Sequence, residues 1–429
     1  MVVNVIKIGG AAISGKNGIF NLIDILRGND EKSILVVSAF GKTTRRLAEC
    51  AVLAESALID DALLRLTSII GYHENILKDI EFNNQLLNSR INSIEDELAN
   101  ILKSIEVTGE LTSRTLDKVM SYGETLCLEI LSAVLEHNNL SIGLIDSRGF
   151  LITDDKHTKA TPNKDATYKQ IVAKVLPLFD EHNLIITQGF VAATQSGATT
   201  TMGIESSNLT ASLLAELLNS KNILIYTDVP GIRSIDPKIY SGHAPINRLS
   251  YKEAIEASRH GVKLIYPQMI EHAQKTQKTI IYRSLLDPAH GETIIGDFAN
   301  NSSKPIINIE HDSYYTEIEF SNNFELIDKS SEIIRAGKGF ISGINISAGK
   351  LKLICWEKFK IGIQSLEFEK KSSAKIIFIP SDKMQESMQA ASNSDVDEIS
   401  ADIETGKISI TGKKDSVERS AIAIHKILH

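Results

Sequence analysis

The chain has 429 residues, a length typical of two or three domains of about 150 residues each. It carries 46 Lys and Arg against 54 Asp and Glu, and the net charge of −8 argues against broad binding to nucleic acid or to an anionic membrane. Hydrophobic residues make up 42% and charged residues 23%, which is typical of a globular chain with a sizeable core.

Cysteine usage and the N-terminus both favour a cytoplasmic protein. Cys50, Cys127 and Cys355 are far apart and form no CxxC pair, which argues against a disulfide framework and a cysteine zinc site. No apolar run approaches the ~20 residues of a membrane helix, and the first residues do not resemble a signal peptide. The one HxxxH spacing, His425 and His429, lies at the C-terminus, where we expect fraying, so we assign no protein metal site.

The first 300 residues alternate strand and helix patterns, which predicts an α/β domain with a mostly parallel sheet. Residues 45–138 show Leu and Ile at three- and four-residue spacing, which indicates a helical subdomain; the repeat is too irregular for a sustained coiled coil. We expect strands at 2–8, 34–38, 141–145, 184–187, 222–227 and 279–282, and helices at 164–180, 209–219 and 252–260.

A largely polar segment at 296–305 indicates a boundary, so we expect domains at 1–300 and 305–429. The second region predicts α+β structure in two small units. Its expected strands are 306–309, 315–320, 341–346, 351–356, 375–379 and 408–411, and its expected helices are 326–335, 384–391 and 417–428.

Two glycine-rich segments near the N-terminus are candidate phosphate sites. Residues 10–17 nearly spell the P-loop GxxxxGK[ST], but Asn17 stands where that motif needs a magnesium-binding hydroxyl, so we reject this interpretation. Lys7, Gly9 and Gly10 at the end of the first strand are better candidates. The lysine can stabilise a transferring phosphoryl group, and the glycines let backbone N–H groups approach phosphate.

Further motifs follow in order along residues 36–267. They are Val36-Val-Ser-Ala-Phe-Gly-Lys-Thr-Thr44, Ser121-Tyr-Gly-Glu-Thr125, Gly189-Phe-Val-Ala-Ala193, Thr199-Thr-Thr-Met-Gly-Ile-Glu-Ser-Ser-Asn208, Tyr226-Thr-Asp-Val-Pro-Gly-Ile232, Asp236-Pro237 and Gly261-Val-Lys-Leu-Ile-Tyr-Pro267. As a set, they resemble the aspartate kinases of the amino-acid kinase superfamily, over essentially all of residues 1–300. The tail resembles, weakly, the pair of ferredoxin-like ACT domains of that family.

The resemblance implies ATP-dependent phosphorylation of the side-chain carboxylate of L-aspartate to 4-phospho-L-aspartate, the first step toward lysine, threonine and methionine. It implies magnesium held mainly by the ATP phosphates. Catalytic roles fall on Lys7, Asn208 and Lys263, and ATP contacts fall on Lys7, Gly9, Gly10, Thr227, Asp228, Arg233, Lys238 and Lys263. Substrate contacts fall on Ser38, Thr44, Glu124, Phe190 and Ser207, with Glu124 paired to the substrate ammonium and the Ser38 and Thr44 hydroxyls donating to its carboxylates.

Two departures from the family pattern concern the substrate. The family usually reads Gly-Arg-Gly-Gly-Ser-Asp where this chain reads Gly203-Ile-Glu-Ser-Ser-Asn208, so Ile204 replaces the arginine that clamps the substrate α-carboxylate, and Asn208 replaces an aspartate. Arg45, Arg46 and Arg148 are unranked replacement cations. The alternatives to aspartate kinase activity are a regulatory or binding subunit with weak catalysis and a kinase for another carboxylate.

The C-terminal region implies a regulatory function by the same resemblance. We expect it to form a homodimer contact, and an amino-acid effector such as lysine or threonine is a second expectation. We expect neither nucleic acid nor membrane as a partner.

Overall fold

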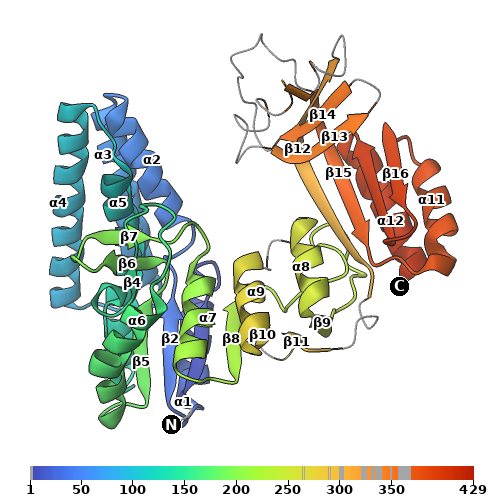
Figure 1. The fold of residues 1–429 in the computed structure, drawn as a ribbon. Coiled ribbons are helices and arrows are strands. Elements are labelled where there is room, and N and C mark those ends of the chain that lie inside the picture. Colours follow the sequence, from blue (N-terminus) through green and yellow to red (C-terminus); the bar gives the residue numbers. More distant parts are fainter. Residues whose placement is uncertain are drawn as a thin grey trace. The chain divides into compact units, whose positions relative to one another are not determined.

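The structure is a computed structural model (Figure 1) that describes residues 3–262, 264, 266–287, 289, 291–298, 304–319, 325, 327, 328, 330, 333, 341–347, 350–355 and 369–429. The chain forms two compact units. The first comprises Met1–Ile232, Asn247–Ile255 and Leu264–Ser302, and the second comprises Arg233–Ile246, Glu256–Lys263 and Ser303–His429. The domain boundary expected at 300–305 stays a prediction, and two short excursions from the first 300 residues belong to the second unit.

The first unit is built on an eight-stranded sheet that is parallel except where β10 meets β11. Its strands are short β-branched runs buried on both faces, which is typical of a parallel sheet covered by helices. In spatial order they are β3 (Ile142–Leu144), β5 (Leu184–Gln188), β2 (Ser33–Val37), β1 (Asn4–Ile8), β8 (Asn222–Thr227), β10 (Thr279–Ser284), β11 (Glu292–Gly296) and β9 (Arg248–Ser250).

Helices cover both faces of this sheet. The helical prediction for 45–138 is confirmed as four separate helices rather than a coiled coil, and Gly109 ends one of them in the left-handed conformation. These helices and α1 pack in one core with Ile6 and Ile8 of β1, whereas α7 packs against β1, β2 and β8 outside that core. The helices are α1 (Lys16–Arg27), α2 (Thr43–Glu55), α3 (Ile59–Asp79), α4 (Gln85–Thr108), α5 (Ser113–His137) and α7 (Ser207–Leu217).

A three-stranded sheet of the first unit lies in the order β4-β6-β7. Its strands are β4 (Ile152–Thr153), β6 (Val191–Thr194) and β7 (Thr199–Thr201). Phe190 immediately precedes β6, and the segment after β7 leads to Ser207 and Asn208. Helix α6 (Lys164–Gln170) continues as a π-helical turn over Ile171–Val175 and a 3-10 helix over Leu176–Asp180. Helix α9 (Pro267–Thr276) also belongs to the first unit, whereas α8 (Tyr251–Arg259) is divided between the two units after Ile255.

The second unit contains one antiparallel six-stranded sheet, so the two small units expected after residue 305 share a single sheet. Two expected strands are one long strand, β12, with an irregularity between Glu310 and Ser313. The expected fraying at the C-terminus is wrong, because His425 is buried and its Nε2 lies 2.8 Å from Ser234 Oγ. The elements are β12 (Ile306–Glu319), β13 (Ile341–Ser347), β14 (Lys350–Cys355), β15 (Glu369–Ile377), β16 (Glu398–Asp402), β17 (Lys407–Gly412), α11 (Met384–Ser392) and α12 (Lys414–Leu428).

Candidate active site

Four neighbouring parallel strands end at one edge of the large sheet, and candidate residues lie at each end. Gly9 follows β1, Ser38 follows β2, Phe190 comes two residues after β5, and Asp228 follows β8. The carboxyl ends of parallel strands meet at the same edge, where α/β proteins bind their ligands. The fold therefore brings together motifs from the beginning and the middle of the chain.

Lys7 is a buried cation at this edge of the sheet. It lies within β1 and is 8% exposed. Its Nζ lies over the following turn, 3.9 Å from the point that a Cβ on Gly9 would occupy. Burial lowers the pKa of Lys7 to about 8, and the negative charges of Glu205 and Glu124 oppose part of that shift. Lys7 is thus a cation held in a poorly solvated position, where its field acts strongly on a bound anion.

Glu124 is a buried carboxylate on α5, 4% exposed. The N–H of Ala39 donates to its Oε1 at 3.3 Å, and the Thr44 hydroxyl lies 3.2 and 3.1 Å from its two oxygens. Burial raises the pKa of Glu124 to about 7, although these hydrogen bonds and the charge of Lys7 hold it lower than burial alone would. In this structure the Thr44 hydroxyl orients Glu124, and its expected donation to a substrate carboxylate stays a prediction.

The two glycines after β1 have different roles. The Gly9 N–H donates to the Tyr226 carbonyl at 2.9 Å, and the predicted ATP contact of Gly9 stays a prediction. Among the described residues the Gly10 N–H has no acceptor. A Cβ on Gly10 would lie 1.8 Å from the Ala39 carbonyl oxygen, so Gly10 also permits close contact between the loops after β1 and β2.

The start of α7 packs directly on the turn after β5. A Cβ on Gly189 would lie 2.6 Å from the Cα of Ser207, so only glycine allows this approach. Phe190, the next residue, is buried in the left-handed conformation at φ 64°. The structure therefore brings Phe190 and Ser207, two predicted substrate residues, to the same place.

Three residues before and within α7 differ in their surroundings. Ile204 is 58% exposed, which is unusual for a large apolar side chain. Glu205 is exposed at φ 70° and near enough to Lys7 to raise the pKa of that lysine. Asn208 Oδ1 is buried without a hydrogen-bond partner in the described part of the chain. Glu205 was not among the site residues predicted from the sequence. It could have been found there, because it places a carboxylate where the resembled family has glycine.

The residues predicted to bind nucleotide do not all lie in the first unit. Thr227 is buried at the end of β8 and its hydroxyl donates to the Val229 carbonyl at 2.7 Å, while Asp228 is exposed. Arg233 and Lys238 belong to the second unit, and Lys263 lies outside the described residues. Nucleotide contacts by these three residues stay predictions.

The lysine of the P-loop-like segment is engaged by a carboxylate, and the glycine before it has no close neighbour. This lysine, Lys16, begins α1 and pairs with Glu81 at 3.3 Å on the surface. A Cβ on Gly15 would have no neighbouring atom within 4 Å, so nothing packs against this glycine. Rejecting the P-loop interpretation agrees with both observations.

The three candidate replacements for the missing arginine differ in their contacts. Arg148 is engaged by Asp146, with Nε 3.0 and 3.1 Å from the two carboxylate oxygens. Arg46 donates to Ser68 at 3.0 Å. Arg45 is exposed and has no ion pair within the described ranges. Among the described residues, Arg45 and Arg46 thus have no carboxylate partner, whereas Arg148 has one.

Membrane-spanning helices and clusters of metal ligands are both absent from the residues that the structure describes. No described helix is both long and apolar enough to cross a membrane. No group of three or more His, Cys, Asp or Glu side chains in the same residues is arranged to hold a metal ion.

A buried lysine, a glycine turn and a buried carboxylate at the carboxyl edge of a parallel sheet define an α/β protein with a site for small anionic ligands. Comparison with known proteins identifies the family within this class. The profile of the Amino acid kinase family matches residues 3–283, and the chain belongs to this family.

The curated relatives are aspartokinases. The chain is 29% identical over 300 residues to lysine-sensitive aspartokinase 3 of Escherichia coli, covering 69% of this chain and 64% of that protein. It is 27% identical over 350 residues to the chloroplastic aspartokinase 1 of Arabidopsis thaliana, covering 79% of this chain and 58% of that protein. The chain thus spans about three fifths of the length of these relatives.

Solved structures show the same fold. E. coli aspartokinase III in complex with aspartate and ADP matches with a TM-score of 0.79 at 20% identity, covering 100% of both chains. Clostridium acetobutylicum aspartate kinase matches with a TM-score of 0.71 at 18% identity, again covering 100% of both chains. The predicted fold class is confirmed: a mostly parallel α/β domain with flanking helices is followed by an α+β region built on an antiparallel sheet.

Proposed function

We propose that this chain transfers the γ-phosphoryl group of ATP to the side-chain carboxylate of L-aspartate, giving 4-phospho-L-aspartate and ADP. The observation that carries the proposal is the buried pair of opposite charges, Lys7 and Glu124, at the carboxyl edge of the sheet. A cation there suits a transferring phosphoryl group, and a buried carboxylate suits the ammonium of an amino acid. The names of the curated relatives support the same reaction.

The reaction needs no proton transfer to activate the acceptor, because the attacking group is already an anion. A carboxylate oxygen of aspartate bonds to the γ-phosphorus, and the bond from that phosphorus to the β,γ-bridging oxygen breaks. ADP leaves with the electron pair of the broken bond. Lys7 stabilises the charge on the phosphoryl oxygens, and the Gly10 N–H is free among the described groups to donate to phosphate.

Magnesium is part of this proposal as the counter-ion of ATP. Its preferred ligands are oxygen atoms, and Asp228 offers an exposed carboxylate at the end of β8. When bound, the ion would neutralise charge on the phosphates, with the phosphates as its main ligands. Gly9 and Thr227 are further proposed nucleotide contacts, and contacts by Arg233, Lys238 and Lys263 stay predictions from the family resemblance. The proposed acceptor side comprises Ser38, Thr44, Glu124, Phe190 and Ser207, and Asn208 keeps its proposed catalytic role with Lys7 and Lys263.

A coupled assay with ATP, magnesium and L-aspartate, with hydroxylamine to trap the acyl phosphate as a hydroxamate, tests the proposal. We expect hydroxamate formation that Lys7→Ala reduces by at least about 1,000-fold. ATP binding measured by calorimetry, without hydroxamate from aspartate, would contradict the proposal.

A kinase for another carboxylate is the second candidate, favoured by the exposed Ile204 and by the extra carboxylate of Glu205. Hydroxamate formation with a panel of amino acids and dicarboxylates separates it from aspartate kinase activity. A binding subunit without turnover would give no hydroxamate with any acceptor.

We also propose that the second unit forms a homodimer contact and binds an amino-acid effector. Analytical ultracentrifugation tests the first part. Thermal unfolding with lysine, threonine or methionine tests the second, and no shift with any of them would exclude these effectors.

A further inference from the structure

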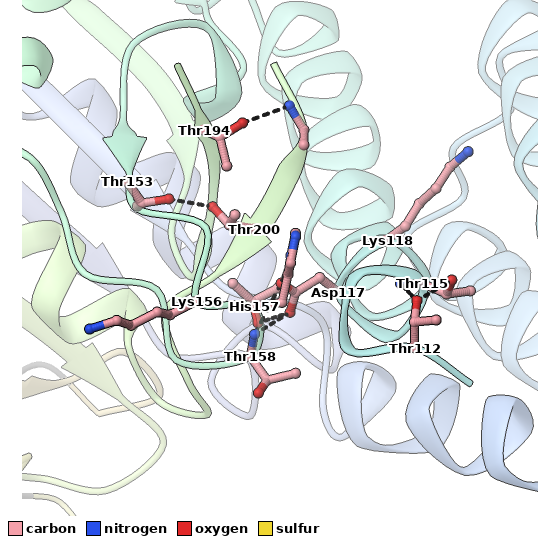
Figure 2. A network of polar contacts seen from close by, with 12 residues as sticks. Thr112, Thr115, Asp117, Lys118, Thr153, Lys156, His157, Thr158, Thr194 and Thr200 are labelled. Carbon is pink, nitrogen blue, oxygen red and sulfur yellow. Dashed lines mark hydrogen bonds and ion pairs between the residues drawn. The ribbon is translucent and has the colours of Figure 1, made fainter. Parts of the chain in front are cut away.

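A buried carboxylate outside the proposed catalytic groups ties three segments of the first unit together. Asp117 on α5 is 0% exposed. Its oxygens accept hydrogen bonds from the Thr201 hydroxyl at 2.5 Å, the His157 Nδ1 at 2.8 Å and the Thr158 N–H at 3.0 Å to each oxygen. Figure 2 shows Asp117 with His157 and Thr158 directly against it. All donors to this carboxylate among the described residues come from the segments at 157–158 and 201.

These donors lead directly to the proposed acceptor side. Thr201 ends β7, and the next residue, Met202, donates its N–H to the Phe190 carbonyl at 3.1 Å. A Cβ on Gly203 would lie 3.7 Å from the Thr158 carbonyl oxygen. The two segments held by Asp117 thus lie beside each other where the chain enters the 203–207 turn.

The same helix carries Glu124 seven residues later, about two turns further on. At that spacing Asp117 and Glu124 share a face of α5. Between them, Met120 packs with Phe190 and Val191. Helix α5 therefore holds Glu124 at one point and, through Asp117, the segment that leads to Ser207 at another.

Breaking the hydrogen bonds to the Asp117 carboxylate would cost free energy. A buried carboxylate needs its donors, because leaving a charge without partners in a buried site costs several kcal/mol. Thr158 adopts φ 67°, a conformation that a β-branched residue rarely takes, so its N–H is held in place by more than local preference. The carboxylate thereby fixes the position of both segments relative to α5.

We propose that Asp117 is a positioning residue that fixes the Thr201–Ser207 segment against α5 and so sets the geometry of the acceptor side of the site. This inference rests on the proposed function for its kinetic consequence. Asp117 binds neither substrate. It acts through Phe190, Ser207 and the 203–205 turn, so its loss should weaken binding of the acceptor much more than binding of ATP.

The test compares the variants Asp117→Asn and Thr201→Val with the wild-type chain. Asp117→Asn keeps the shape but loses the charge, and Thr201→Val removes one donor from a strand that accommodates valine. Glu216→Gln is the matched control. Glu216 also bonds a histidine, His272 at 2.9 Å, but lies at the far end of α7.

Two measurements decide the proposal. In hydrogen–deuterium exchange, we expect peptides over 201–207 to exchange at least about tenfold faster in Asp117→Asn, with β10 unchanged. In the hydroxamate assay, we expect a KM for aspartate about 10 to 100-fold higher, with the KM for ATP within about twofold. Thr201→Val should show both effects more weakly, and it decides the matter where Asp117→Asn fails to fold.

Unchanged exchange over 201–207 would overturn the positioning role. An equal rise in both KM values, or the same pattern in Glu216→Gln, would also overturn it. A wild-type protein without aspartate turnover contradicts the proposed function instead, and the exchange measurement then still decides the role of Asp117.

Discussion

The Thr44 hydroxyl on α2 lies 3.2 and 3.1 Å from the two carboxylate oxygens of Glu124 on α5. The two residues are 80 positions apart, and each belongs to a different helix of the same subdomain. This contact orients a buried carboxylate before a substrate arrives. It therefore favours a preorganised acceptor site over one assembled on binding.

Glu124→Gln should lower kcat/KM for aspartate by about 100-fold, because a charged hydrogen bond to the substrate ammonium becomes neutral. ATP affinity by calorimetry should stay within about twofold of wild type. Thr44→Val is the companion variant and should have a smaller effect, since it removes only the group that orients Glu124. An unchanged KM for aspartate in Glu124→Gln would show that the ammonium binds elsewhere.

The pH dependence of kcat/KM should be a narrow bell. Protonation of Glu124, whose pKa is about 7, removes the ammonium site on the acidic side. Deprotonation of Lys7, whose pKa is about 8, removes the phosphoryl-stabilising charge on the alkaline side. Glu205→Gln should move the alkaline limb to lower pH, because the negative charge of Glu205 raises the pKa of Lys7. An alkaline limb that moves upward in this variant would contradict the assignment.

Gly10→Ala should destabilise the protein by about 1–3 kcal/mol and abolish turnover, because the new Cβ would overlap the backbone carbonyl of Ala39 at 1.8 Å. Gly15→Ala is the matched control from the P-loop-like segment. It has free space for a Cβ and should leave activity unchanged. Urea unfolding and the hydroxamate assay check both variants, and loss of activity in Gly15→Ala would revive the P-loop interpretation.

Ile204→Arg should lower the KM for aspartate by about tenfold, because it supplies a charge-assisted partner for the substrate α-carboxylate. The position is 58% exposed, so the substitution should change the unfolding free energy by less than about 0.5 kcal/mol. Ile204→Lys controls for charge without the bidentate geometry. An aspartate KM that rises in Ile204→Arg would favour a different carboxylate as the natural acceptor.

His73 should contribute a fall in the free energy of unfolding as pH falls from about 6.5 to 4, whereas Glu124, whose pKa burial raises to about 7, contributes the opposite change. Burial lowers the pKa of His73 to about 4 in the folded protein, against about 6.5 in an unfolded chain. Within that pH window His73 is protonated in the unfolded state and neutral in the folded state. Its contribution to the free energy of unfolding therefore decreases by up to about 1.4 kcal/mol for each unit by which the pH falls. Urea unfolding of His73→Gln should show a shallower decline, while the exposed His137→Gln should match wild type.

The hydrophobic pattern predicted the parallel strands β1, β2, β3, β5, β8 and β10, because each is a short apolar run rich in β-branched residues. It did not predict the short or edge strands β4, β6, β7, β9, β11 and β16. β8 begins and ends at the residues expected from the pattern, and the helices of 45–138 follow their Leu and Ile spacing. Strand interruptions were less predictable. β12 is continuous where the pattern indicated two strands, because its pairing with β15 continues past the irregularity after Glu310.

By itself, the sequence determined the family, the alternation of strand and helix, and the motifs at the strand ends, because these depend on local pattern and order. Only the tertiary structure decided which groups interact there. The pKa values of Lys7 and Glu124 depend on desolvation by segments far along the chain. The hydrogen bonds of Asp117, on which its proposed role rests, likewise come from donors 40 and more residues away, which no local pattern in the sequence encodes.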